Sequence, residues 1–460
     1  MKTAEVKSFY ACSGCGSVFA RWHGRCPDCG AWDTLHEEKD SARPAPAKST
    51  AKKRRVAAPA ATPLADVQPD TAGFIATGIA EFDLTLGGGA MPGSTVLVGG
   101  EPGIGKSTLL LQVAGRLSQR GIPTLYVSGE ESAAQIKHRA DRLGIRSGLH
   151  LLTETDLAAI LAAADQLKPH PRALILDSIQ TTFDRQWQSP PGTVAQVREC
   201  AAAISDWARR HDAVAFVIGH VTKDGFIAGP KVLEHMVDTV LQFEGDRRQW
   251  IRLLRCLKNR YGPTHEVGLF EMTEAGLNEV TDPSGHFLTD HAPGGRAAGS
   301  AVAVAIEGRR PLLLEIQSLV GQGVGNSPQR VVSGPDPRRA AIIIAVLQNI
   351  AGLSLSGRDI YLNITGGFVT DEPAVDLGCA VAVASSALKR PADPRTVWIG
   401  ELGLGGEIRG VPQIKRRLIE AEKIGFQRAI VPAANQRDIA YGGEMQIEPV
   451  GRIDQALAGI

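Results

Sequence analysis

Residues 100–108, GEPGIGKST, carry the most specific chemical pattern in the chain because they satisfy GxxxxGK[ST] in full. A β-rich run over 94–98 precedes them and a helical apolar pattern over 109–117 follows, the setting in which this loop has physical meaning. Gly100, Gly103 and Gly105 let backbone amides converge on phosphates, while Lys106 would reach the β- and γ-phosphates and the Ser107 hydroxyl would bind Mg²⁺. We therefore expect ATP and Mg²⁺ at this loop.

Three further apolar runs end in polar residues. Residues 124–127 lead to Glu130, residues 173–176 lead directly to Asp177, and residues 214–218 lead to His220. Runs that are apolar throughout indicate central parallel strands, whose carboxyl ends share one edge of a sheet. We expect Glu130 to orient and polarise the attacking water and Asp177 to bind Mg²⁺. His220 fits a sensor of the γ-phosphate, and a hydrogen-bonded loop histidine is the alternative.

Four cysteines lie within eighteen residues as two CxxC pairs, Cys12 with Cys15 and Cys26 with Cys29. Two such turns place four thiolates around one tetrahedral ion, so we expect one structural Zn²⁺ per chain. The alternative is a pair of redox motifs, but neither pair opens a βαβ unit. A ribbon of this kind can bind protein, touch DNA or cover a domain, and the sequence leaves these roles open.

Composition suggests a soluble chain of several domains. At 460 residues about three domains are expected, and 50 Lys+Arg against 49 Asp+Glu leave a net charge of +1. Nucleic acid could therefore be bound only through local basic patches. No apolar run is long enough to span a bilayer, and the N-terminus lacks the pattern of a secretory signal. We expect a cytoplasmic protein without membrane contact.

Punctuation by Pro and Gly and shifts in composition predict four segments. These are a zinc ribbon over 1–38, a flexible basic linker over 39–72, an α/β ATPase domain over 73–290 and a second α/β block over 291–460. The linker contains the cluster KKRR at 52–55. It could touch phosphate or simply be solvated.

A basic run without acids covers residues 247–260. Its six bases are Arg247, Arg248, Arg252, Arg255, Lys258 and Arg260. We take Arg252 and Arg255 as candidate DNA contacts, with a solvated strand face as the alternative.

The stretch from Thr77 to the phosphate loop, with LGGG at 86–89, resembles the RecA/DnaB/KaiC group of ATPases. With the four-cysteine ribbon and the sequence KNRYG at 258–262, the chain is similar to the bacterial RadA (Sms) family, whose diagnostic motif is KNRFG. The resemblance implies a homohexameric ring with ATP between subunits, moving on single-stranded or branched DNA beside a recombinase or a replicative helicase. It implies that Lys106, Ser107 and Thr108 bind nucleotide. It also implies that Lys258 and Arg260 act on the neighbour's γ-phosphate or couple ATP to DNA.

The block after residue 296 resembles the proteolytic domain of Lon-type proteases, with one decisive departure. Where that family has its nucleophilic serine, this chain has Ala374, which has no oxygen to form an acyl-enzyme. Lys415 matches the family's lysine base, but a base without a nucleophile is not a catalyst. We expect Lys415, Arg416 and Arg417 to contact DNA phosphates instead, a solvated helix face being the alternative.

The fold class expected is therefore α/β: a RecA-like P-loop ATPase core, an N-terminal zinc ribbon and a Lon-protease-like C-terminal domain. The expected function is DNA-dependent ATP hydrolysis in recombination and repair, driving branch migration or unwinding. The sequence leaves two alternatives. A KaiC-like regulatory ATPase would bind protein only and is opposed by the basic run. An ATP-dependent protease is opposed by Ala374.

Overall fold

The structure, a computed structural model, describes most of the chain beyond residue 72 and parts of the N-terminal segment. The described residues are 8–12, 18–19, 21–27, 30, 32, 34–39, 63, 73–146, 148–187, 189–220, 232–245, 251–264, 266–280, 287–288, 297–323, 328–439 and 442–460. Of the expected linker, only Lys39 and Pro63 fall among them.

The chain divides into two compact units. The first comprises Met1–Glu244, Leu253–Thr264 and Met272–Asn278, and the second Gly245–Arg252, His265–Glu271 and Glu279–Ile460. The domain boundaries expected from the sequence stay predictions.

Within the first unit, the N-terminal segment forms a small antiparallel sheet. Its strands are β1 (Ser8–Cys12), β2 (Val18–Phe19) and β3 (Leu35–Lys39), in the order β2-β1-β3. Cys12, Cys26 and Leu35 are buried in one cluster, with Tyr10 and Phe19 packed against it.

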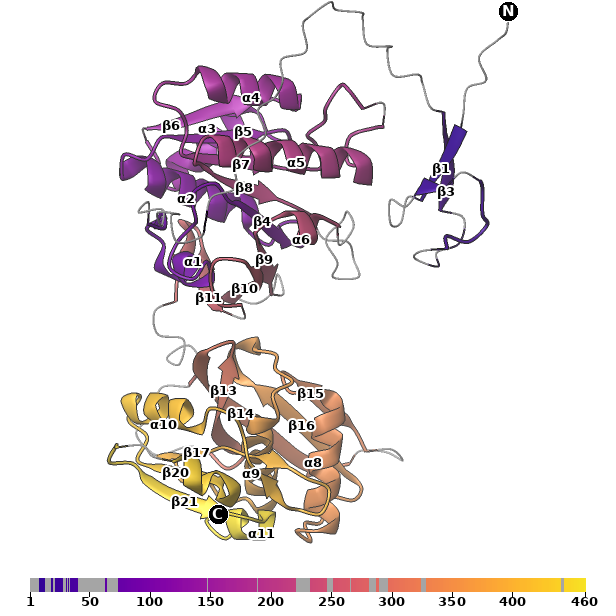
Figure 1. Ribbon diagram of the computed structural model, residues 1–460. Helices are drawn as coiled ribbons and strands as arrows, with labels where there is room; N and C mark the ends of the chain where they lie inside the picture. The colour runs from indigo at the N-terminus through magenta and orange to yellow at the C-terminus, as the bar shows by residue number, and fades with distance from the viewer. Residues whose placement is uncertain are drawn as a thin grey trace, which may run out of the picture. The chain divides into compact units, whose positions relative to one another are not determined.

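A nine-stranded sheet, in the order β12-β11-β10-β9-β4-β8-β7-β5-β6, follows (Figure 1). Its strands are β4 (Thr95–Gly100), β5 (Thr124–Ser128), β6 (Leu149–Thr153), β7 (Ala173–Asp177), β8 (Val214–Ile218), β9 (Thr239–Glu244), β10 (Ile251–Asn259), β11 (Val267–Thr273) and β12 (Gly276–Glu279). The six strands from β9 to β6 pair in parallel, and β10 joins them antiparallel to β9. The four apolar runs predicted as strands are present as β4, β5, β7 and β8.

One helix precedes β4, and the others connect the parallel strands. They are α1 (Ala80–Thr85), α2 (Lys106–Gln119), α3 (Ala133–Arg142), α4 (Leu157–Gln166), α5 (Val194–Arg210) and α6 (Val232–Met236). Local signals fix two of their starts. Ser132 and Gln135 form a capping box at α3, and the Asp156 side chain accepts the Ala158 N–H at α4.

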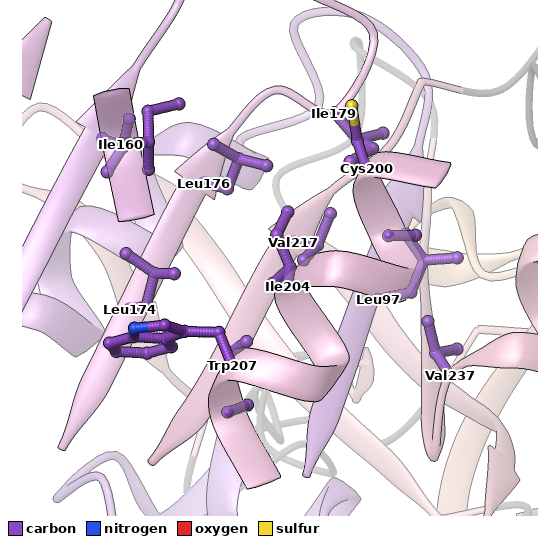
Figure 2. Packing of buried hydrophobic residues seen from close by; sticks show 14 of the residues in the cluster. Leu97, Ile160, Leu174, Leu176, Ile179, Cys200, Ile204, Trp207, Val217 and Val237 are labelled. Atoms are coloured by element: carbon purple, nitrogen blue, oxygen red, sulfur yellow. The ribbon is translucent and has the colours of Figure 1, made fainter. Parts of the chain in front are cut away.

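Both faces of this sheet are buried. On one face, Leu97, Leu174, Leu176 and Val217 pack against Ile160 of α4 and against Ile204 and Trp207 of α5 (Figure 2). The alternate residues of the same strands, among them Val98, Tyr126 and Ile175, are buried on the opposite face. A central strand that is covered on both sides can present polar groups only at its ends, which is where the candidate site residues lie.

The second unit is built on a seven-stranded mixed sheet in the order β15-β16-β14-β13-β17-β20-β21. Its elements are β13 (Ser300–Glu307), β14 (Arg310–Gln322), β15 (Arg330–Ser333), α8 (Pro337–Asn349), β16 (Arg358–Ile364), α9 (Asp376–Leu388), β17 (Thr396–Trp398), α10 (Ile414–Lys423), β20 (Arg428–Pro432), β21 (Gln446–Val450) and α11 (Ile453–Leu457), with a small hairpin of β18 (Glu401–Leu402) and β19 (Ile408–Arg409).

Helix α9 is the centre of the second unit. Its first ten residues are all buried, as expected for a helix that is apolar on every side. Ser385 and Ser386 serve this packing, since their hydroxyls accept the N–H groups of Gly299 at 2.8 Å and Val320 at 2.9 Å. Within the described residues, no helix is long and apolar enough to cross a membrane.

Candidate nucleotide-binding and hydrolysis site

The loop between β4 and α2 requires glycine at two positions. Gly100 has a φ of +152°, and a Cβ there would lie 2.8 Å from the Cβ of Phe243. Gly105 has a φ of +120°, and a Cβ there would lie 2.8 Å from the side chain of Met272. Gly103 also has a positive φ, +79°. Because these residues have no side chains, the backbone amides of the loop are left unobstructed, as phosphate binding requires.

Lys106 begins α2 and lies inside this loop. Its side chain is buried, and its Nζ donates to the carbonyl oxygens of Gly100 at 2.8 Å and of Glu101 at 2.9 Å. Burial lowers the pKa of Lys106 to about 8, although the carboxylates of Asp177, Glu130 and Glu101 act to raise it. The ammonium group thus occupies the loop that would hold phosphates.

Three neighbouring strands deliver the predicted polar residues to one edge of the sheet. Asp177 is the last residue of β7, Glu130 follows β5 by two residues and His220 follows β8 by two. The structure brings all three together with Lys106, whose charge interacts with those of Asp177 and Glu130.

Glu130 is held by two donors on a single oxygen. Its Oε1 accepts a hydrogen bond from the Ser178 hydroxyl and lies 3.1 Å from Nε2 of His220. Burial acts to raise the pKa of Glu130, but the hydrogen bonds from Ser178 and His220 and the charges of His220 and Lys106 together outweigh it, so the pKa lies below its ordinary value. The carboxylate is therefore ionised at neutral pH, as polarisation of water requires.

Asp177 is fixed on two sides. It is 4% exposed, its Oδ2 accepts the hydroxyl of Tyr126 at 2.8 Å, and it is also hydrogen-bonded to Ser107. Burial raises the pKa of Asp177, and these two hydrogen bonds act to lower it. A carboxylate and a hydroxyl that meet beside a phosphate loop are the hard oxygen donors that Mg²⁺ prefers, so the residues present fit this ion. Sequence reasoning missed Tyr126 because it lies inside an apolar strand.

The first half of KNRYG, at 258–259, joins separate segments of the first unit. Lys258 Nζ donates to the carbonyl oxygens of Glu234 at 2.6 Å and Val237 at 2.7 Å, which end helix α6. The Asn259 side chain donates to the carbonyl of Leu86 at 3.0 Å. The expected trans-acting lysine therefore binds carbonyls of its own chain here.

The second half of the motif converges on Asp238. Its side chain is 3% exposed, and its Oδ1 lies 3.2 Å from Nη1 of Arg260. Its Oδ2 accepts the backbone N–H of Thr95, the first residue of β4, at 3.0 Å. Tyr261 also hydrogen-bonds to Asp238, an interaction that phenylalanine cannot make. The motif thus links β10 to the base of the strand that carries the phosphate loop.

The basic run is less accessible than its charge predicts. Arg247 and Arg248 lie outside the described residues. Arg252 is 5% exposed and donates to the carbonyl of Ile251, while Arg255 is paired with Glu244 at 3.2 Å. Arg252 is unsuited to phosphate contact because it is buried, which corrects the expectation for that residue.

Two of the four ribbon cysteines are described. Cys12 and Cys26 are 2% and 1% exposed and lie in one cluster, an arrangement that fits a shared metal. Cys15 and Cys29 lie outside the described residues, so the four-thiolate site stays a prediction. On the surface of the ribbon, Trp32 is 71% exposed and the Arg25 guanidinium lies 5.8 Å from its ring centroid.

The two positions matched to the serine and the lysine of a Lon-type protease lie in different environments. Ala374 is buried in the core, whereas Lys415 is exposed on α10. Lys415 lines a cavity of about 610 Å³ together with Arg309, Gln413, Arg416 and Ile419.

Arg417 differs from its two basic neighbours. It is completely buried, pairs with Glu372 and donates to the carbonyls of Val304 at 2.5 Å and Pro412 at 3.1 Å. It therefore cannot reach phosphate from this position, which corrects the expectation that it contacts DNA. Arg309, whose Nη1 lies 3.3 Å from Oε1 of Glu266, lines the cavity beside Lys415 and Arg416.

Three family models match separate segments of the chain. Residues 61–225 match the AAA domain family model, residues 10–37 match the rubredoxin metal binding domain and residues 328–435 match the subunit ChlI of Mg-chelatase. A solved structure, described as the crystal structure of the RadB recombinase, is 23% identical and covers 45% of this chain and 99% of its own, with a TM-score of 0.37. The expected fold class, a RecA-like core with a zinc ribbon and a Lon-like domain, is confirmed.

Two curated relatives match almost from end to end. The DNA repair protein RadA of Bacillus subtilis is 45% identical over 99% of this chain and 98% of its own length. The DNA repair protein RadA of Pseudomonas aeruginosa is 46% identical over 99% of both chains. With this identity along its whole length, the chain belongs to the RadA family of DNA repair proteins.

Proposed function

We propose that this chain is an ATP hydrolase that converts nucleotide turnover into movement on single-stranded or branched DNA during repair. The observation that carries the proposal is the convergence of Lys106, Glu130 and Asp177 beside a complete phosphate loop. Family membership adds DNA repair as the setting. We propose the cytoplasm as the compartment.

Each residue has a chemical role in the proposed reaction. The loop amides and Lys106 bind the phosphates, and Lys106 exchanges the carbonyls of Gly100 and Glu101 for phosphate oxygens. Glu130 orients and polarises the attacking water. His220, which borders Glu130, senses the γ-phosphate.

Asp177 and Ser107 would hold Mg²⁺, and Thr108 completes the nucleotide contacts. When bound, this ion neutralises charge on the phosphates. Zn²⁺ would be held by Cys12, Cys15, Cys26 and Cys29 and would supply folding free energy to the ribbon.

Lys258 and Arg260 are proposed to act across a subunit boundary in a homohexamer. Lys258 would then leave the carbonyls of Glu234 and Val237, and Arg260 would leave Asp238. The free energy for this exchange must come from a neighbour's γ-phosphate, so ATP at one subunit would release segments of the next.

We place one set of DNA contacts at the basic cavity of the second unit. Arg309, Lys415 and Arg416 share its lining, and no salt bridge is found for Lys415 or Arg416 among the described residues. Replacing Lys415 and Arg416 by alanine should flatten the slope of log K against log salt by about 1.4 on single-stranded DNA, at about 0.7 per phosphate contact. An unchanged slope would reject the contacts.

The function as a whole is tested by ATP turnover with and without single-stranded DNA at low salt. We expect DNA to raise turnover and Lys106→Ala to abolish it. Mass measurement with nucleotide bound should show a hexamer. A wild-type chain that stays monomeric and whose turnover ignores DNA would refute the motor. A recombinase or a replicative helicase is the expected protein partner.

A further inference from the structure

We infer that Tyr126 is a positioning residue that holds the Asp177 carboxylate in the orientation that binds Mg²⁺. The inference rests on the proposed function, because it deepens the description of the same nucleotide site. It concerns a hydroxyl group on β5, a strand separated from β4 and its phosphate loop by β7 and β8.

The geometry of two neighbouring strands brings Tyr126 to Asp177. Tyr126 lies in the middle of β5 opposite Ile175 of β7, and Asp177 lies two residues further along β7. Residues two apart point to the same face of a sheet, so the tyrosine and the aspartate are diagonal neighbours across the strand pair. A long aromatic side chain spans this diagonal, and the hydroxyl reaches Oδ2 at 2.8 Å.

Burial of both side chains favours this hydrogen bond over hydrogen bonds to water. Tyr126 is 1% exposed and Asp177 is 4% exposed, so water does not compete freely for either group. Ser107 is hydrogen-bonded to the same carboxylate from the phosphate loop. With Tyr126 on one side and Ser107 on the other, rotation of the carboxylate about its Cβ–Cγ bond is restricted.

The consequence concerns metal affinity more than fold. Hydrogen bonds to a ligating group orient it, and their loss costs about 10–100-fold in metal affinity. Without the hydroxyl of Tyr126, the Asp177 carboxylate would rotate among orientations, only some of which face a nucleotide-bound ion. ATP itself would still be held by the loop amides and Lys106.

The test compares the affinity of Tyr126→Phe and the wild type for a fluorescent ATP analogue, first in EDTA and then across a Mg²⁺ titration. We expect equal affinities in EDTA and a midpoint for Mg²⁺ about 10-fold higher in the variant. An identical Mg²⁺ midpoint would overturn the inference. A loss of affinity in EDTA as well would also overturn it, because the effect would then be on the loop as a whole.

Two controls separate positioning from general damage. Tyr361→Phe removes a hydroxyl that bonds Gln329 at 3.1 Å in the second unit, and its Mg²⁺ midpoint should not change. In an Asp177→Asn background, Tyr126→Phe should add nothing to the shift, since the two residues act as one unit. Additive shifts would contradict a role through Asp177. A wild type that binds no nucleotide in either condition would instead reject the proposed function.

Discussion

Replacing Arg417 by alanine should strongly destabilise the C-terminal unit, although the residue belongs to a basic triplet on a surface helix. The guanidinium is 0% exposed and bonds the carbonyls of Val304 and Pro412 and the carboxylate of Glu372. Alanine would leave Glu372 without this counter-ion and the carbonyls of Val304 and Pro412 without this donor, the first of them buried.

Breaking a buried ion pair from one side costs about 3–5 kcal/mol, and each buried group left unpaired costs about 1–3 kcal/mol. The cost of breaking the ion pair already includes the cost of leaving Glu372 unpaired, so the two figures are not simply added. We expect the free energy of unfolding to fall by an amount near the upper end of the first range. Even the lower end of this range, about 3 kcal/mol, would make the opened state of the unit about 150-fold more populated.

The assay is native-state hydrogen exchange on the full chain, following amides of β13 and β14. These central strands report the opening of their own unit without interference from the remainder of the chain. Lys415→Ala and Arg416→Ala are matched controls, because both side chains are exposed on the same helix. Surface substitutions change stability by about 0.5 kcal/mol or less, so their exchange should stay within about threefold of the wild type. If Arg417→Ala behaved like these controls, the buried pair would not stabilise the unit.

Other predictions concern the nucleotide site, the KNRYG motif and the ribbon. Bound phosphate favours the charged form of Lys106, whose pKa is about 8 without nucleotide. Nucleotide binding in EDTA should therefore take up protons. If the pKa of Lys106 in the complex returns to its ordinary value, the affinity should weaken about eightfold from pH 7.5 to 9. Calorimetry checks this, a flat wild-type profile would contradict it, and Lys106→Arg should show no such dependence. Asp238→Ala should speed amide exchange in β4 at least 10-fold, because Thr95 and Arg260 lose their acceptor. Tyr261→Phe should change this exchange rate less than threefold. Equal effects of the two substitutions would refute the central role of Asp238. Cys26→Ser should lose about one zinc per chain, as measured with a chromogenic chelator, and should keep its ATP turnover. The control variant Cys200→Ser should keep the metal. Zinc retained by Cys26→Ser would count against the four-thiolate site.

Much of the nucleotide site follows from sequence because its residues sit where regular structure ends. A complete phosphate loop and apolar runs ending in Asp177 or near Glu130 and His220 identify a parallel sheet edge without any knowledge of contacts. Tyr126 could not be found in this way. It lies within such a run, and its link to Asp177 depends on which strand is the neighbour and in which register.

For Arg252 and Arg417, by contrast, the sequence does contain a pattern that indicates burial, although their charge suggests exposure. On α10 the buried residues are Ile414, Arg417, Leu418 and Ala421, spaced i, i+3, i+4 and i+7, so Arg417 shares the apolar face while Lys415 and Arg416 do not. On β10, Arg252 alternates with Leu254 and Cys256, and all three are buried. A cation at a core position of a periodic pattern must find an acceptor inside the fold, because an unpaired charge there is too costly. Counting bases along a segment predicts nucleic-acid contacts only after those positions are removed, and for α10 this leaves the two residues that line the cavity.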